Sequence, residues 1–181
     1  MDDRERQENL LGAYALAVAD RLRATTEREV GHAGSSAAAL VTVAHFPGRT
    51  VEFLRQAIGL SHPATVRVVD GLVEQGLVRR RLAGRGPAVA LTVTAAGRRR
   101  ARRILAARRE VLAAALPPLS AREAEALTAV LERALAHLAG VPRTTVCRLC
   151  DLGGCRHLDC PVVRRQVELG ATPPEPVPLA E

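Results

Sequence analysis

Apolar residues recur at steps of three and four positions in several parts of this chain, and this spacing predicts amphipathic helices. The first stripe, between Asn9 and about Val30, consists of Leu11, Tyr14, Val18 and Leu22. The charged residues 1–8 in front of it are expected to be frayed. A Gly/Ser-rich break at residues 31–36 separates this helix from a second one, which stops at Pro47.

Two short helices come next, with the residues "GLS" at 59–61 as the tight turn between them. A β-hairpin follows, because an apolar pair at residues 77–78 and the β-prone stretch 88–93 flank a Gly/Pro/Arg-rich tip. Two longer helices complete the pattern. Thr94 is suited to cap the first, and "SARE" at 120–123 starts the second with the spacing of a capping box. This order of elements predicts a helix-turn-helix followed directly by a wing.

The second helix of the helix-turn-helix has an apolar face, which we expect to be buried and which consists of Val66, Val69, Leu72 and Val73. The residues left to face outward in its N-terminal half are then His62, Thr65, Arg67 and Val68. A recognition helix presents this half to base edges in the major groove. Arg67 is suited to a bidentate contact with a guanine or to a phosphate contact. Thr65 is either a DNA contact or an ordinary solvated helix residue.

The residues "TVEFLRQAIGLSHPATVRVVDGLVEQGLVRRR" and "VALTVTAAGR" resemble the MarR family of winged-helix transcriptional regulators. The likeness is strong over residues 50–98 and extends over about residues 9–139. It implies a winged helix-turn-helix between dimerisation helices, a homodimer built from the first helix and the last two, and a wing that contacts the minor groove. Proteins of this family often bind small aromatic acids, so a small-molecule effector is compatible with the resemblance.

Candidate DNA contacts lie in the recognition helix and in the wing: Ser61, His62, Thr65, Arg67, Arg79, Arg80, Arg81 and Arg85. Arg85 takes the minor-groove position of the family by its place at the wing tip, although the family's neighbouring Asp is missing here. Between Arg79 and Glu110 the chain has eleven Arg and one acidic residue. We expect the Arg of the wing to contact DNA phosphates. The Arg cluster at the start of the next helix is either a DNA contact or a solvated face.

Overall composition is weaker evidence for an anionic partner than the placement of charge along the chain. The net charge is +7, but all 26 basic residues of the 181-residue chain are Arg, which indicates a composition bias as well as an anionic partner. There is no apolar stretch of about 18 residues, the length of a membrane span, and the polar N-terminus is unlike a secretory signal. A cytoplasmic protein without a membrane partner is expected. Neither a phosphate-binding loop nor a catalytic triad pattern is present, so we expect no enzyme.

All four cysteines fall within one short segment and have the spacing C-x2-C-x4-C-x4-C: Cys147, Cys150, Cys155 and Cys160. This is the ligand spacing of a zinc knuckle, with Cys155 in place of the His. Four thiolates suit a tetrahedral Zn²⁺ site, and disulfides are uncommon in the cytosol. An iron–sulfur cluster, a thiol redox centre and four reduced cysteines without a ligand remain alternatives. We expect the segment to pack near the dimerisation helices.

The predicted fold class is mainly α, a winged helix-turn-helix with one small β-hairpin wing and flanking dimerisation helices. The predicted parts are an N-terminal dimerisation helix at 1–33, the winged helix-turn-helix at 34–97, dimerisation helices at 98–142, a four-cysteine metal-binding segment at 143–168 and a disordered tail at 169–181. The predicted function is a homodimeric, sequence-specific regulator, a repressor, that binds double-stranded DNA and holds a structural Zn²⁺. The alternative is an iron–sulfur or thiol redox sensor that regulates transcription through its cysteines.

Overall fold

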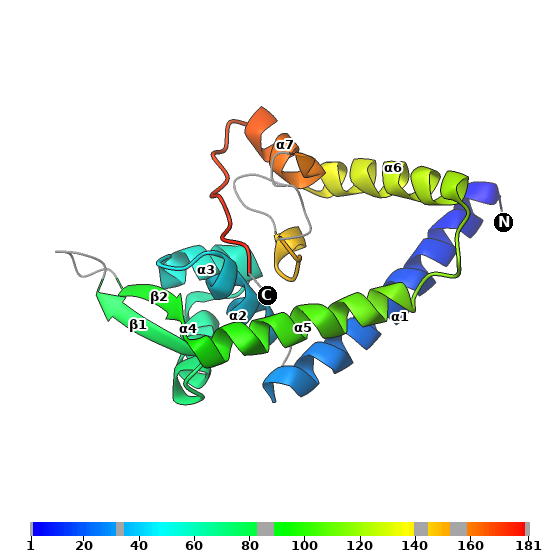
Figure 1. Cartoon of the computed structure of the whole chain (residues 1–181). Helices are drawn as coiled ribbons and strands as arrows, with labels where there is room; N and C mark the ends of the chain where they lie inside the picture. Colours follow the sequence, from blue (N-terminus) through cyan, green and yellow to red (C-terminus); the bar gives the residue numbers. More distant parts are fainter. Residues whose placement is uncertain (1, 32–34, 83–88, 140–144, 153–158, 180–181) are drawn as a thin grey trace.

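The computed structural model describes residues 2–31, 35–82, 89–139, 145–152 and 159–179 (Figure 1). Within these ranges the chain is mainly helical with one small antiparallel hairpin, which confirms the predicted fold class. The elements are α1 (Asp3–Val30), α2 (Ser35–His45), α3 (Val51–Ile58), α4 (His62–Glu74), β1 (Val78–Leu82), β2 (Val89–Val93), α5 (Ala95–Ala113), α6 (Ala121–Leu138), the 3-10 helix η1 (Thr145–Cys147) and α7 (Pro161–Glu168). Among them, no helix is long and apolar enough to cross a membrane.

The hydrophobic core surrounds α2, which is buried from Ser36 to His45. Helices α1, α3, α4 and α5 and strand β2 all pack on it. The Ala-rich sequence of α2 suits this position, because small side chains let several neighbours approach one helix closely. The largest side chains that are almost fully buried come from α2 and its neighbours, and they are Leu40, Leu54, Leu72, Leu91 and Ile104.

The helix-turn-helix consists of α3, the turn at residues 59–61 and α4, as the sequence predicts. Gly59 ends α3 in the left-handed conformation with φ 71°, and its N–H donates to the Arg55 carbonyl oxygen at 3.0 Å. Ser61 then starts α4, because its side chain accepts a hydrogen bond from the Ala64 N–H at 3.4 Å. The turn therefore fixes where the recognition helix begins.

Strands β1 and β2 form the wing, in a register that pairs Val78 with Val93. The wing joins the body at Gly97, where an added Cβ would lie 2.1 Å from the Leu77 carbonyl oxygen. A glycine at this position lets the start of α5 approach the residue in front of β1 that closely. The tip of the wing, which includes Arg85, lies outside the described residues.

Helix α1 lies along α5, and both helices extend away from the winged helix (Figure 1). Two arginines of α5 hold the end of α1. Arg100 donates to the Glu29 carbonyl oxygen, and the Arg103 guanidinium lies 3.2 Å from the Glu29 carboxylate. These two members of the Arg cluster on α5 therefore fasten one helix to another.

The start of α1 differs from the prediction. The helix begins at Asp3, so the expected fraying of residues 1–8 is wrong for most of that stretch. Asp2 and Glu5 form a capping box: the Glu5 N–H donates to the Asp2 carboxylate at 2.7 Å, and the Asp2 N–H donates to the Glu5 carboxylate at 2.9 Å. These two hydrogen bonds satisfy free N–H groups that would otherwise favour fraying.

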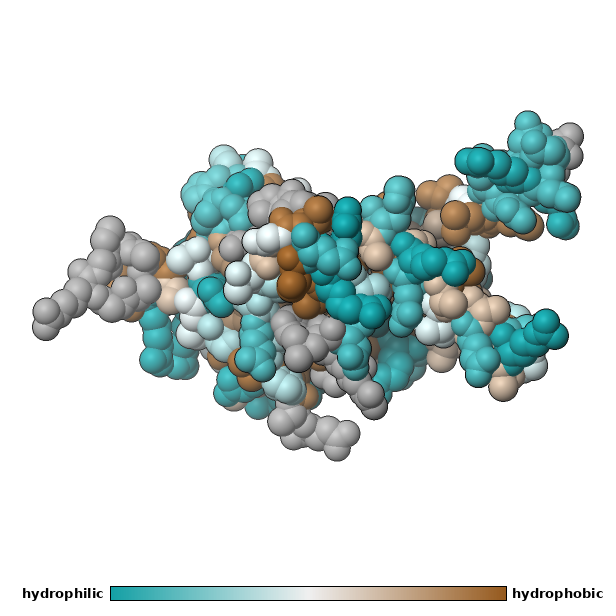
Figure 2. All heavy atoms as spheres, turned by 90° about the horizontal axis from the view of Figure 1, so that it is seen from above, coloured by the Kyte–Doolittle hydropathy of each residue, from teal (hydrophilic) through white to brown (hydrophobic). Residues whose placement is uncertain are grey.

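Helices α1 and α6 expose much apolar surface. None of the residues of α6 is buried. The large exposed apolar side chains of the two helices are Leu10, Leu11, Tyr14, Leu16, Val130, Leu131 and Leu138. Figure 2 shows apolar surface at the right-hand end of the molecule, where Figure 1 places the N-terminal part of α1 and the start of α6. A single chain leaves these faces uncovered.

The C-terminal tail also departs from the prediction of disorder. Residues 171–179 form no helix or strand but run back to the winged helix (Figure 1). The Val177 N–H donates to the His45 carbonyl oxygen at 2.7 Å, and His45 Nδ1 donates to the Val177 carbonyl oxygen at 3.0 Å. Leu179 packs against the core. The tail is ordered here because the C-terminal end of α2 supplies both a donor and an acceptor.

Candidate DNA-binding face and cysteine cluster

The N-terminal half of α4 exposes some of the predicted DNA contacts. Ser61, His62 and Arg67 are exposed, and Arg67 forms no ion pair with another residue in the described part of the chain. Ser61 is also the cap of α4, so its hydroxyl is already engaged with the backbone. His62 and Arg67 are thus exposed side chains of the N-terminal half of α4 that can form hydrogen bonds with a partner.

Thr65 does not face outward from α4 as predicted. Its side chain is fully buried, and its hydroxyl donates to the Ser61 carbonyl oxygen at 2.9 Å. The expectation that Thr65 faces DNA is therefore wrong, and so is the outward placement of Val68, which packs partly buried against the core. Thr65, Val69 and Leu72 follow one another at steps of four and three, so this helical spacing was the available signal for an inward position.

The wing presents arginines beside α4. Arg79, Arg80 and Arg81 are exposed on β1, and successive side chains of a strand point to opposite faces. Arg80 differs from the other two, because its Nη1 lies 2.6 Å from the Asp70 Oδ1 of α4. This ion pair, which no local pattern in the sequence predicts, joins the wing to α4. Arg79 and Arg81 form no ion pair with any residue in the described ranges and remain open to phosphates.

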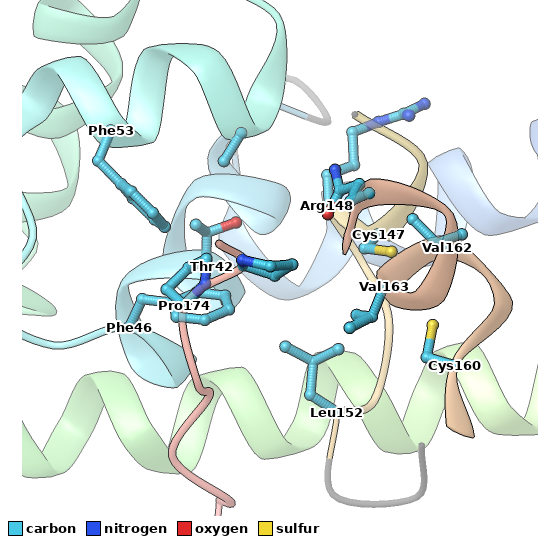
Figure 3. Close-up of a pocket in the computed structure, with 13 residues that line it drawn as sticks. Thr42, Phe46, Phe53, Cys147, Arg148, Leu152, Cys160, Val162, Val163 and Pro174 are labelled. Carbon is cyan, nitrogen blue, oxygen red and sulfur yellow. The ribbon is translucent and has the colours of Figure 1, made fainter. Parts of the chain in front are cut away.

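Three of the four cysteines meet at the end of η1 and the start of α7. The Cys147 thiol hydrogen-bonds with both Cys150 and Cys160, and none of the three forms a disulfide. Figure 3 shows the sulfur atoms of Cys147 and Cys160 near each other. Cys155 lies outside the described residues. Among the residues that are described, no group of three or more His, Cys, Asp or Glu side chains is arranged as a metal site.

The hydrogen bonds polarise the thiols. The bond donated by Cys147 lowers the pKa of the Cys150 thiol to about 7, and the positive charge of Arg108 acts in the same direction. The hydrogen bonds with Cys150 and Cys160 raise the pKa of Cys147. The contact with Cys147 and the charge of Arg108 thus favour the thiolate form of Cys150, and a thiolate is the form that binds soft metal ions.

The cysteine segment touches both halves of the molecule. Thr145 in η1 packs on the helix-turn-helix so closely that its Cγ2 lies 2.7 Å from where a Cβ of Gly59 would be. Asp151 Oδ2 lies 3.1 Å from Arg109 Nη2 of α5, and Leu149 packs against the main core. Helix α7 packs on α6. The expected packing near the predicted dimerisation helices is present, through α5 and α6, and the contact with the helix-turn-helix is an addition that the sequence did not predict.

The structure so far defines a winged helix-turn-helix protein with helical arms and an additional cysteine segment. A model described as MarR family matches residues 33–86. Solved structures share the fold. YusO from Bacillus subtilis is 18% identical with a TM-score of 0.61, over 74% of this chain and 99% of that chain. MepR, a transcription regulator of the Staphylococcus aureus multidrug efflux pump MepA, is 16% identical with a TM-score of 0.62. The match covers 72% of this chain and 97% of that chain.

Two further similarities concern bound molecules. A mutant of MepR bound to an oligodeoxyribonucleotide matches with 16% identity and a TM-score of 0.54, over 73% of this chain and 97% of that chain. The Mycobacterium tuberculosis MarR family protein Rv2887 in complex with salicylic acid is 23% identical with a TM-score of 0.54. The match covers 69% of this chain and 93% of that chain. The comparison with curated proteins found no match. The chain therefore has the fold of MarR family regulators, and about a quarter of it extends beyond these structures.

Proposed function

We propose that this chain is a homodimeric regulator of transcription that binds double-stranded DNA sequence-specifically. The observation that carries the proposal is the exposure of His62 and Arg67 on the N-terminal half of α4, together with the exposure of Arg79 and Arg81 on β1, the wing strand that packs on α4. The first pair is positioned to read base edges and the second to contact phosphates. The proposed activity involves no catalysis. A dimer bound over a promoter would block transcription, so we propose a repressor.

The fold comparisons support this proposal. The MepR mutant, which has the same fold, is bound to an oligodeoxyribonucleotide. Rv2887, also of this fold, is in complex with salicylic acid, which supports a small-molecule effector for the present chain.

The proposed homodimer rests on the exposed apolar faces of α1 and α6. Burial of a large apolar side chain contributes roughly 1.5–3 kcal/mol, and Leu11, Leu16 and Leu131 are all about half exposed or more. A two-fold dimer would cover these faces and would place two recognition helices on one duplex. Light scattering at micromolar concentration tests this, and a monomer would contradict it.

The cysteine cluster is proposed to hold one Zn²⁺ through Cys147, Cys150, Cys155 and Cys160. The spacing of the four cysteines supports it, together with the contacts of Cys147 with Cys150 and Cys160, because thiolates are soft ligands that suit Zn²⁺. A bound Zn²⁺ would cross-link η1 to α7. The alternative, an iron–sulfur or thiol redox sensor, uses the same thiols. Elemental analysis and the visible spectrum of the purified protein separate the two, since a zinc site is colourless.

The DNA-binding proposal is tested by fluorescence anisotropy with labelled duplexes over a range of salt concentrations. Specific binding should weaken steeply as salt rises, because Arg–phosphate contacts release counterions. Arg122, exposed at the start of α6, provides a matched control. The Arg122→Ala variant loses the same charge as an Arg79→Ala variant but lies on another element, so only Arg79→Ala should reduce the salt slope. Binding that does not depend on salt would contradict the proposal.

A further inference from the structure

A pocket of about 110 Å³ lies between the helix-turn-helix and the cysteine segment (Figure 3). One wall comes from the end of α2 and from α3, with Phe46 and Phe53. The opposite wall comes from η1, α7 and Leu152, and includes Val163. Pro174 belongs to a third wall made by the tail. The pocket therefore exists only because the cysteine segment and the tail fold back onto the winged helix.

The lining is apolar and aromatic. The centroids of the Phe46 and Phe53 rings lie 5.4 Å apart and the rings are tilted by 58°, and the guanidinium of Arg49 lies 5.4 Å from the centroid of the Phe53 ring. Thr42 and Gln166 are the uncharged polar side chains of the lining, and both are buried. The charged residue of the lining is Arg148, which is exposed and donates to the Thr145 carbonyl oxygen. A carboxylate placed in the pocket against the two phenylalanines would lose its hydration without gaining a buried cation.

We propose that this pocket binds an uncharged aromatic molecule of about the size of benzene or toluene, carrying at most one hydrogen-bonding group. The volume of the pocket limits the size of the ligand, because an engineered apolar cavity of about 150 Å³ is known to bind benzene. Thr42 and Gln166 would accommodate a single hydroxyl or carbonyl group. The binding itself does not depend on the proposed DNA-binding function.

The site has a mechanical consequence. A ligand in it touches α3, the first helix of the helix-turn-helix, and the side chains of Cys147 and Cys160 on the other wall. It therefore bridges the same two parts that Thr145 and Gly59 bring into contact. That this contact regulates DNA binding rests on the proposed function, whereas occupancy of the pocket can be measured without DNA.

The test is a titration of the full-length protein with toluene, without DNA, followed by methyl-region NMR. Saturable shifts of the Ala57 and Val163 methyl signals, with one ligand per chain, are expected below about 1 mM toluene. Benzoate, which has the same ring with a negative charge, is the ligand control and should bind at least tenfold more weakly. No saturable shift with toluene, or tighter binding of benzoate, would overturn the proposal.

Two variants on one helix locate the site. Val163→Phe fills the pocket and should weaken toluene binding at least tenfold. Val167→Phe adds the same side chain at an exposed position of α7 that does not line the pocket, and should change the affinity less than twofold. Ala57→Leu fills the pocket from α3 and should also weaken toluene binding, so it replaces Val163→Phe in this test if that variant fails to fold. Equal affinity in the filled and control variants would place the ligand elsewhere and refute the site.

Discussion

The winged-helix core and the cysteine segment are stabilised in different ways. The core has side chains of at most 1% exposure in several elements, among them Leu40, Leu72 and Ile104. The segment has a small cluster in which Ala139, Cys160 and Val162 are buried. Burial of apolar surface is extensive in the first region, whereas the second has little of it and contacts α3, α5 and α6; we propose that a metal ion bound by its thiols stabilises it further. Perturbations of metal and of apolar packing should therefore affect different parts of one chain.

Metal removal should have the largest local effect. A structural zinc contributes on the order of 10 kcal/mol to the folding of a small segment. We expect a chelator to remove the hydrogen-exchange protection of η1 and α7 and to leave that of α2 unchanged, as measured by mass spectrometry of peptides. The Cys160→Ser variant should give the same pattern without chelator. Protein that contains no metal as purified, with four freely titratable thiols, would show that the segment has no metal site.

A cavity in the core should affect the whole fold. Leu72 is 1% exposed, so Leu72→Ala is expected to lower the free energy of unfolding by about 2–5 kcal/mol in urea denaturation. Val162→Ala, the matched change in the segment, should leave the global transition nearly unchanged, because the segment can open before the core does. Similar losses for both variants would show that the two regions unfold as one unit.

Arg67→Ala should weaken DNA binding without changing the stability of the fold. Loss of a side chain that reads a base is expected to cost roughly 1–3 kcal/mol of binding free energy and to relax sequence choice. Because Arg67 is exposed, the urea transition should stay the same. Arg85→Ala, at the wing tip, should instead reduce the salt slope by about one ion and keep most of the specificity. Equal losses on operator and random DNA for Arg67→Ala would rule out base reading.

The pH dependence of core stability should be the smallest effect. Burial lowers the pKa of His45 and outweighs the opposing hydrogen bond to the Val177 carbonyl oxygen. The unfolded chain then takes up a proton at about pH 6.5 while the folded chain does not, so stability is full above that pH and falls as the pH drops below it. Urea titrations at several pH values measure this. The slope should vanish in His45→Gln and persist in His62→Gln, where the histidine is exposed.

Local patterns in the sequence predicted the elements but not all of their contacts. The caps at Thr94 and Ser120 act within a few residues, so the starts of these two helices were predictable from the sequence. The pairing of Arg80 with Asp70 joins two elements and depends on how the wing lies on α4. The direction of Thr65 was readable from helical spacing, but its place in a DNA-contacting stretch suggested otherwise.

The C-terminal part was the least predictable. Its Pro-rich composition is typical of disordered tails, and nothing local indicates that Val177 pairs with His45, which lies far away in the sequence. The same holds for Thr145 against Gly59, since both residue types are common in solvated turns. The spacing of the cysteines predicted a metal site. The structure brings Cys147 into contact with Cys150 and Cys160, and the metal site stays a prediction. These long-range contacts become visible only in the three-dimensional structure.

The central claim is that a dimer reads double-stranded DNA with the exposed half of α4. Selection of bound sequences from a random duplex library tests it most directly, with the wild-type chain and Arg67→Ala compared side by side. We expect enrichment of an imperfect palindrome with half-sites about one helical turn apart for the wild-type chain, and loss of defined bases within each half-site for the variant. A library that shows no enrichment with the wild-type chain, or the same motif from both proteins, would contradict it.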